Sequence, residues 1–596
     1  MVSAKGVVGR LAIASSILLY LNAISLAWAQ QQLFQTPQQT PQTSKEAITN
    51  EIRQFIKDLQ DNGTIPGISV AVVHSDGVVE LEGFGKKTED GVGMTADTLF
   101  NIASCSKAFL ASSVGILMDD FAHGRNVTPL PEGVEAFNWY TRVKDILPDD
   151  WQLMNEWANE KATFRDILSH VSGLESHDLS YRRWDSLQDV VRRLRHLRPT
   201  AELRQEYMYN NQMFFVGSYV VAEYSGLSYH EFVKERIFTP LNMSTSTFLS
   251  SEASERGLLT QTWERDGRRI PFWFTDELSV LNAGAGGVIS SAEDLSKWVK
   301  MFLHGGVNPA TNATILPQAQ FDALTTAHSL SVSKPPFPEF SVFGYGLGWN
   351  RYSYQGHEIL RHAGGSPGVS SQVAFLPSAK VGVVVLCNAS GKADQSVAIL
   401  YRILEDFLGL RRVASARYAA LAARDVLTRE ASPPPGASPP AKQNSDERIS
   451  SLEIYDGTYA NIAYPNVTIC APTTTERSPT CKDVFDNFGR LEDTSASQDT
   501  LYVAIPSIWS THARLHRVEG DRFRLAGTYI LPNGYGADKS PFELKEIEEF
   551  VANVEFVVEK GRVIGFAQYH ISGVVSERRR RGGTPQETAD VWFERV

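Results

Sequence analysis

A proline-rich segment divides the chain into two regions with different patterns. The segment reads ASPPPGASPPAKQNSDE from Ala431. Clustered prolines exclude helix and central strand and favour an extended chain. We therefore expect a linker over residues 426–449, with a larger domain before it and a smaller one after it.

The larger region combines helical and strand patterns. ITNEIRQFIKDLQDNG from Ile48 has helical spacing, and ISVAVVHSDGVVELEGFG from Ile68 holds two strand-like runs around Ser-Asp-Gly, which is typical of a hairpin. A hydrophobic fraction of 42% with 21% charged residues is ordinary for a globular protein with a sizeable core. We expect a folded domain over residues 45–425.

The smaller region reads as strands throughout. YDGTYANIAYPNVTI, RFRLAGTYIL and VEFVVEKGRVIGFAQYHI alternate in strand fashion between glycine and asparagine turns. This predicts a small all-β domain over residues 450–596. Cys470 and Cys481 are close enough in sequence to close a small disulfide loop, whereas we expect Cys105 and Cys387 to be free, buried thiols.

The start of the chain has the pattern of a secretory signal. Two basic residues precede an apolar stretch from Leu11, and the small-x-small triplet that ends at Ala29 fits cleavage. An uncleaved membrane anchor is the alternative, but the serines and Asn22 in the stretch favour removal. We expect a signal peptide at residues 1–29, a flexible linker at 30–44 and a secreted protein with no stable membrane span.

Two further features bear on compartment and partners. The net charge of −11 leaves no basic surface for nucleic acid, so that class of partner is excluded. Sequons for N-glycosylation agree with a secretory route. They lie at Asn62, Asn126, Asn242, Asn312, Asn388 and Asn466.

A serine and a lysine at the start of an apolar run are the first candidates for chemistry. In NIASCSKAFLASSVGILMDD from Asn101, Ser104 and Lys107 are three residues apart, so on a helix they project from one face. A partly desolvated lysine loses proton affinity and can draw the proton from a nearby hydroxyl. The other S-x-x-K match, Ser331 to Lys334, is followed by PPFP and has no rigid helix to align it.

Two later motifs also lie next to a predicted helix or strand that can hold them in place. Tyr209-Asn210-Asn211 begins YNNQMFFVGSYVVAEYSG, a loop that runs into an apolar helix. RHAGGSPGVSSQVAFLP carries His362 from a strand edge through glycines into another strand-like run. The chain thus holds S-x-x-K, Y-x-N and H-x-G in that order, 105 and 258 residues after Ser104.

With these motifs the chain resembles the serine β-lactamase and penicillin-binding protein superfamily, in its class C-like branch of D-peptidases, carboxylesterases and acyltransferases. The resemblance covers about Ile48 to Leu410, and the tail is similar to the lipocalin-like β-barrel often appended to such hydrolases. It implies an α+β fold (an α/β sandwich): an antiparallel sheet flanked by helices, an all-helical subdomain and a small C-terminal β-barrel.

The resemblance also implies roles for single residues. Ser104 is the nucleophile, Lys107 and Tyr209 transfer protons, and which of the two is the primary base stays open. Asn211, His362 and Gly364 bind substrate, with Asn211 also orienting Lys107. The backbone amides of Ser104 and Gly365 form the oxyanion hole.

One departure from the family bears on the substrate. The superfamily's K-T-G motif is replaced here by H-x-G, so Ala363 offers no hydroxyl and His362 is largely neutral near pH 7. The carboxylate of an antibiotic or of a D-alanyl peptide therefore finds fewer binding groups here. We expect a small-molecule or peptide ester or amide with an apolar acyl part; FWF from Phe272 either lines its pocket or belongs to the core.

Other catalytic chemistries find less support in the chain. We expect His170, in LSHVSGL, to cap backbone groups rather than to act as a base. No pair of histidines or cysteines has the spacing of zinc ligands, so we expect no metal and no cofactor.

The expected function is a secreted serine hydrolase that forms an acyl-enzyme at Ser104. The alternative is an acyltransferase of a biosynthetic pathway with the same machinery. A D-peptidase, a β-lactamase or a catalytically retired binding protein fits the sequence less well.

Overall fold

The computed structural model describes residues 46–74, 76–431, 451–491, 499–544, 551–570, 578–580 and 582–596. Residues 47–596 belong to one compact unit. The predicted signal peptide at 1–29 and the linker at 30–44 lie outside the described residues. Within the described ranges, no helix has the length and apolar character needed to cross a membrane.

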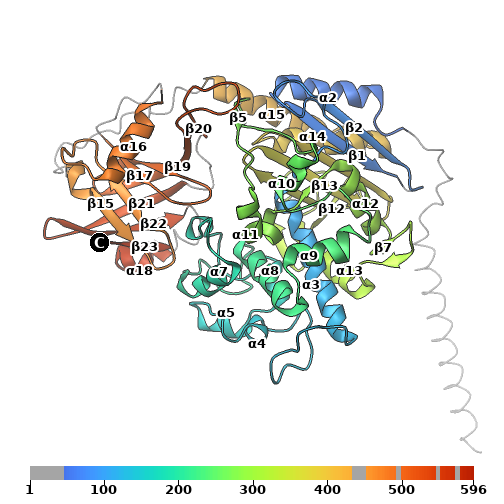
Figure 1. The fold of residues 1–596 in the computed structure, drawn as a ribbon, viewed down its shortest axis with the longest axis horizontal. Helices are drawn as coiled ribbons and strands as arrows, with labels where there is room; N and C mark the ends of the chain where they lie inside the picture. Colours follow the sequence, from blue (N-terminus) through green and yellow to red (C-terminus); the bar gives the residue numbers. More distant parts are fainter. Residues whose placement is uncertain are drawn as a thin grey trace, which may run out of the picture. The chain divides into compact units, whose positions relative to one another are not determined.

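An eight-stranded antiparallel sheet is the centre of the larger domain (Figure 1). Its order is β2-β1-β14-β13-β12-β11-β10-β9. The strands are β1 (Gly67–Val73), β2 (Val79–Gly85), β9 (Ser329–Val332), β10 (Phe343–Tyr345), β11 (Asn350–Tyr354), β12 (His357–Ser366), β13 (Val369–Leu376) and β14 (Val381–Cys387). The hairpin expected after Ile68 is the β1–β2 pair. Strands β1, β13 and β14 are buried along their whole length.

Helices cover both faces of this sheet, which explains why its central strands are apolar throughout. Side chains alternate between two cores. Val383 packs in one core with Ile403 of α14 (Ala393–Leu408) and with α2 (Asn50–Asn62). Val384 packs in the other with Trp298 of α12 (Ala292–Leu303). The expected sheet flanked by helices is confirmed.

A helical region stands next to the sheet and carries the start of the predicted site (Figure 1). Helices α3 (Ser106–Ala122), α8 (Gln212–Ser225) and α11 (Asp276–Gly286) pack on one another. Glycines at 217 and 284 both face Leu110, which lets the three helices approach closely. Shorter helices are α4 (Val143–Ile146), α5 (Glu156–Lys161), α6 (Phe164–Leu168), α7 (Leu187–Arg193), α9 (Tyr229–Val233), α10 (Ser250–Glu255) and α13 (Gln318–Thr325).

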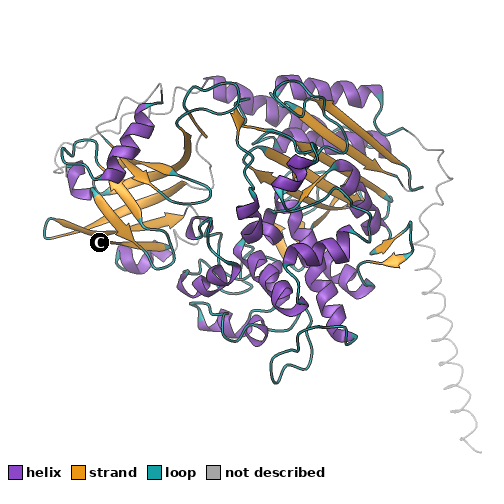
Figure 2. Ribbon diagram, viewed as in Figure 1, coloured by secondary structure: helices purple, strands orange, loops and turns teal. Residues whose placement is uncertain are grey.

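The C-terminal domain is a closed barrel of eight antiparallel strands (Figure 2). Its order is β18-β17-β16-β15-β23-β22-β21-β19, and pairing of β19 with β18 closes it, while β20 adds to β19. The strands are β15 (Gly457–Ala460), β16 (Val467–Cys470), β17 (Thr500–Ala504), β18 (His512–Glu519), β19 (Arg522–Leu531), β20 (Phe542–Leu544), β21 (Val551–Glu559), β22 (Arg562–His570) and β23 (Val591–Arg595). The predicted C-terminal β-barrel is confirmed.

The disulfide and the two free, buried thiols are as the sequence predicts, and a helix enters the range expected to be the linker. Cys470 of β16 and Cys481 of α16 (Pro479–Gly489) form a disulfide, and Cys105 and Cys387 are free and buried. Burial raises the pKa of Cys105 to about 11, so this thiol stays protonated. Helix α15 (Ala414–Ala431) extends into the range predicted as linker, and the rest of that range lies outside the described residues.

Candidate active site

Ser104 lies on a tight turn that leads into α3. The turn follows β3 (Phe100–Asn101) and is the short helix η1 (Ala103–Cys105). Ala103 has φ 46°, a left-handed conformation that side chains disfavour. Asn101 holds it, because its Oδ1 accepts from Ala103 N at 2.9 Å and its Nδ2 donates to Gly286 O at 2.8 Å. The turn presents a half-buried Ser104.

Lys107 and Tyr209 both reach the hydroxyl of Ser104. Lys107 Nζ is 3.1 Å from Ser104 Oγ, and Tyr209 OH is 2.8 Å from the same atom. Lys107 comes from the next turn of the chain and Tyr209 from the loop that precedes α8, as the sequence predicts. The structure therefore brings the three predicted catalytic side chains together within hydrogen-bond distance.

The amino group of Lys107 is fully buried and surrounded by acceptors. Besides Ser104, its Nζ contacts Asn211 Oδ1 at 2.7 Å and Ala285 O at 2.8 Å. An ammonium donates to all three neighbours. A neutral amine keeps the Asn211 and Ala285 contacts and turns its lone pair toward the hydroxyl of Ser104. The predicted orienting contact between Asn211 and Lys107 is present in this geometry.

The polar residues that hold Asn211 belong to none of the sequence motifs. They belong to the segment Glu175–Tyr181, which we call the barrel-facing segment because its residues also contact the C-terminal domain. Asn211 Nδ2 donates to Asp178 Oδ2 at 3.1 Å, and Asn210 Nδ2 donates to the Glu175 carbonyl at 2.6 Å. No motif marks Asp178; a carboxylate near a Y-x-N loop is visible only after folding.

His170 packs against Tyr209 rather than reaching Ser104. Its Nδ1 accepts from Asn210 N at 3.1 Å, which is the backbone cap expected from the sequence. The ring is fully buried and its centroid lies 4.4 Å from that of Tyr209. Burial, with Lys107 nearby, holds the pKa of His170 well below its usual range, so the ring stays neutral.

Strand β12 runs beside the turn that carries Ser104, and two adjacent glycines of the strand differ in their surroundings. A Cβ at Gly364 would lie 2.2 Å from Ile102 O and 2.3 Å from Ser371 Oγ, so no side chain fits. A Cβ at Gly365 would meet nothing within 4 Å, and this residue is exposed. Gly364 therefore allows the close approach of strand and turn, while Gly365 is free to face a ligand.

His362 is placed differently from the predicted substrate-binding role. Its side chain is only 4% exposed and both ring nitrogens have partners. Nδ1 donates to Ala363 O at 2.7 Å, and Nε2 accepts from Tyr345 OH at 3.0 Å. Burial and the charge of Lys107 lower the pKa of His362 to about 3, so it is neutral as expected. Its geometry supports the strand rather than a direct contact with substrate.

The aromatic sequence FWF joins the core between the two domains. Trp273 and Phe274 form one apolar cluster with Leu544 of β20, and the half-buried Trp509 of the barrel packs on it. The rings of Trp273 and Trp509 are stacked with centroids 6.1 Å apart. The core alternative for FWF is therefore the one that the packing supports.

One of the six predicted glycosylation sites is wrong. Asn388 is fully buried, its Oδ1 accepts from Gly67 N at 2.7 Å and its Nδ2 donates to Lys86 O at 3.0 Å. A glycan there would break the contacts between the sheet and the loop after it. The other acceptor side chains are accessible in part or in full. These are Asn62, Asn126, Asn242, Asn312 and Asn466.

Among the described residues, one group has the proximity of metal ligands: Glu175, His570 and Asp590. Its members already have partners in the protein. His570 Nδ1 is hydrogen-bonded to Glu175, and Asp590 Oδ1 pairs with Arg578 at 2.8 Å. We interpret the group as an ion-pair network between the domains.

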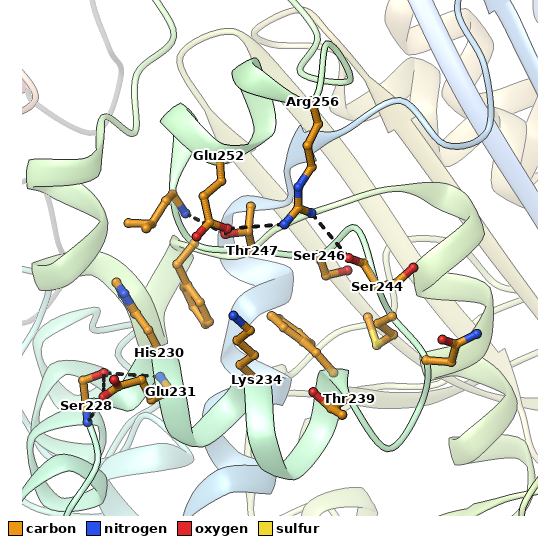
Figure 3. Close-up of a pocket in the computed structure, with 15 residues that line it drawn as sticks. Ser228, His230, Glu231, Lys234, Thr239, Ser244, Ser246, Thr247, Glu252 and Arg256 are labelled. Atoms are coloured by element: carbon orange, nitrogen blue, oxygen red, sulfur yellow. Dashed lines mark hydrogen bonds and ion pairs between the residues drawn. The ribbon is translucent and has the colours of Figure 1, made fainter.

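A pocket of about 380 Å³ (Figure 3) has a lining that includes none of Ser104, Lys107 and Tyr209. Its walls come from α9, the π-helical turn η4 (Lys234–Phe238) and α10. Both acidic side chains that line it have partners: Glu252 lies 3.6 Å from Arg256, and Glu231 accepts from Ser228 at 2.7 Å. The pocket therefore adds no group to the chemistry at Ser104.

Fold and site together define a class: proteins with a serine, a lysine and a tyrosine in contact at the junction of an antiparallel sheet and a helical region. The chain belongs to the beta-lactamase family, because the family model of that description matches residues 52–406. These residues include all of the predicted site from Ser104 to Gly365.

Two of the curated relatives and one of the solved structures illustrate what the chain is similar to. An unguisins hydrolase of Aspergillus campestris is 30% identical over 375 residues, which is 61% of this chain and 66% of the relative. An unguisins hydrolase of Aspergillus violaceofuscus is 31% identical over 374 residues, 58% of this chain and 62% of the relative. The chain thus spans somewhat less than two thirds of each relative's length.

The structural likeness includes a penicillin-binding protein homologue from Pyrococcus abyssi that forms an octamer. Its TM-score is 0.52 at 19% identity, over 87% of this chain and 97% of that chain. At this identity the likeness shows a common fold.

Proposed function

We propose that the protein is a secreted serine hydrolase that cleaves an ester or amide through an acyl-enzyme at Ser104. The observation that carries the proposal is the convergence of Lys107 Nζ and Tyr209 OH on Ser104 Oγ, at 3.1 and 2.8 Å. A serine hydroxyl is a weak nucleophile until a neighbouring base takes its proton. Two such groups stand within reach.

In the first step Ser104 Oγ attacks the carbonyl carbon of the substrate. The O–C bond forms while the hydroxyl proton passes to the Lys107–Tyr209 pair. The tetrahedral intermediate then collapses, the bond to the leaving group breaks, and the alcohol or amine departs with a proton from Tyr209. The acyl group remains on Ser104.

In the second step a water molecule attacks the acyl-enzyme. The same pair takes the proton of the water and returns one to Ser104 Oγ, so the acid is released and the serine is restored. The hydrolase names of the two curated relatives favour water over another acceptor. Unguisins are accordingly among the first compounds to assay.

The oxyanion of each intermediate needs two fixed donors. We assign them to the backbone amides of Ser104 and Gly365, because Gly364 brings β12 against the turn that holds Ser104. Removal of one such donor typically costs about 3 kcal/mol of transition-state stabilisation.

The neutral, internally bonded His362 supports a substrate without a carboxylate at this position. An apolar acyl group therefore fits better than a β-lactam antibiotic or a D-alanyl peptide. Acyl transfer to an alcohol or amine is the second candidate, because the same acyl-enzyme serves both reactions. The pattern of the amino-terminal sequence and the accessible sequons support secretion as part of this proposal.

A fluorophosphonate probe followed by peptide mass spectrometry tests the proposal. We expect an adduct on Ser104 in the wild type and none in Ser104→Ala, with Ser331→Ala as the matched control because it removes the serine of the other S-x-x-K match. Turnover of p-nitrophenyl esters, with and without an added amine, separates hydrolysis from transfer. A wild-type protein without an adduct on Ser104 would contradict the proposal.

A further inference from the structure

The barrel contacts the catalytic domain at the segment that holds the reactive loop. Trp509, in the barrel loop between β17 and β18, donates from Nε1 to Tyr181 OH at 3.1 Å. Tyr464 OH lies 2.6 Å from His177 Nδ1, and His570 is hydrogen-bonded to Glu175. Three barrel side chains thus fix the barrel-facing segment, residues 175–181.

Hydrogen bonds continue from this segment to the nucleophile. Tyr181 OH donates to Asp178 Oδ1 at 2.8 Å, and Asp178 accepts from Asn211 Nδ2 at 3.1 Å. Asn211 Oδ1 faces Lys107 Nζ at 2.7 Å. A continuous series therefore runs from the indole of the barrel to the amine beside Ser104.

The chemistry of each group fixes the direction of this series. An indole N–H only donates, so the hydroxyl oxygen of Tyr181 accepts and its proton points at Asp178. An ionised carboxylate only accepts, so Asn211 must turn its NH₂ group toward Asp178. Its carbonyl oxygen then faces Lys107, whereas the flipped amide would present N–H groups to a cation.

From this we propose that Trp509 of the barrel is a positioning residue for Lys107, acting through Tyr181, Asp178 and Asn211. The inference rests on the proposed acylation of Ser104 and extends it, because it makes the C-terminal barrel part of what activates the nucleophile. Tyr181 is fully buried and its ring packs on Phe215 of α8 at 5.1 Å, so the intermediate link is held by the core.

The test measures acylation separately from binding. Trp509→Phe keeps an aromatic ring and removes the N–H donor, and Tyr181→Phe removes the hydroxyl. Pre-steady-state kinetics with a p-nitrophenyl ester give the acylation rate constant and the substrate dissociation constant. We expect each variant to lower the acylation rate constant about tenfold and to change the dissociation constant less than twofold.

Arg268→Gln is the matched control, because Arg268 contacts the barrel elsewhere, at Ser540 Oγ and Ser540 O. It loosens the same domain contact without touching the series, and we expect acylation within twofold of the wild type. An equal loss in Arg268→Gln would show that any damage to the contact suffices and would overturn the proposal.

A double-mutant cycle distinguishes a series from independent packing. With Asp178→Asn in place, Trp509→Phe should add little further loss, because the link through Asp178 is already broken. Full additivity would overturn the proposal. If Ser104 is labelled and both single variants acylate at the wild-type rate, the positioning role is wrong while the proposed function stands; without labelling in the wild type, both fail.

Discussion

The two sides of the site are built in different ways. The nucleophile side, residues 101–107, is continuous in sequence and leads into α3, nearly all of whose residues are buried. The barrel-facing segment has regular structure only in the single turn η2 (Asp178–Ser180). Side chains of the barrel, which lie 287 or more residues further along the chain, hold this segment in place.

Each side is therefore sensitive to a different kind of substitution. A change on the nucleophile side acts on the reacting atoms or on backbone packing against them. A change on the barrel-facing segment acts through hydrogen bonds, which are worth about 1 kcal/mol each. The first kind of change should have large effects and the second smaller ones.

The largest effect is expected from Lys107→Met. The change removes the amine that contacts Ser104 and Asn211, and keeps an apolar side chain in a fully buried position. Acylation should fall about 10³-fold or more, since proton transfer by a positioned side chain contributes about 10² to 10⁴. Burst kinetics measure this, and exposed Lys482→Met is the control. If Lys107→Met kept a tenth of the wild-type acylation rate, Lys107 would not be a proton-transfer group.

A smaller effect is expected at the paired glycines of β12. Gly364→Ala places a Cβ 2.2 Å from Ile102 O, so the strand must move away from the nucleophile turn. Ester hydrolysis should fall about 100-fold, the scale of losing one oxyanion donor. Gly365→Ala should stay within about threefold, because nothing lies within 4 Å of its added Cβ. Equal effects at both positions would contradict this account of the turn.

The smallest effect concerns acid stability and two buried histidines, His177 on the barrel-facing segment and His362 on β12. Burial lowers the pKa of His177 to about 4 and that of His362 to about 3. Between those values and the unfolded pKa of 6.5, the unfolded chain binds a proton that the folded chain does not, so stability falls as the pH falls. Each histidine should contribute about 2 kcal/mol of loss between pH 7.5 and 5.

Urea unfolding at pH 7.5 and 5 measures this loss. His177→Gln and His362→Gln should each lose less stability on acidification than the wild type, and exposed His304→Gln should behave as the wild type does. If either variant lost as much unfolding free energy between pH 7.5 and 5 as the wild type, groups other than that histidine would cause the acid lability.

Much of the fold followed from patterns over short distances. Proline clustering, strand alternation and helical spacing predicted a mixed domain before a small all-β domain, because these signals act within a few turns of chain. The same holds for Ser104 and Lys107, whose relative position depends on one turn. That the β domain is a barrel was implied only by the family resemblance. Tyr209 and Gly365 were reached only through the order of three motifs and the family resemblance.

The features that could not be predicted from the sequence depend on contacts between residues far apart in the chain. Asp178 and Trp509 belong to no motif, and only folding brings both to the hydroxyl of Tyr181. Asn388 satisfies a sequon yet lies where β14 meets the start of β1, so its amide is enclosed. Gly364 and Gly365 look alike in sequence, and only the neighbouring turn distinguishes them.

The central sheet also has a consequence for synthesis of the protein. Strand β1 lies between β2, its neighbour in sequence, and β14, which begins at Val381. A growing chain therefore carries an apolar strand edge that finds its partner only after about 300 more residues have been made. The catalytic domain cannot close strand by strand, and ribosome-bound chains that stop before Val381 should need a chaperone to stay soluble.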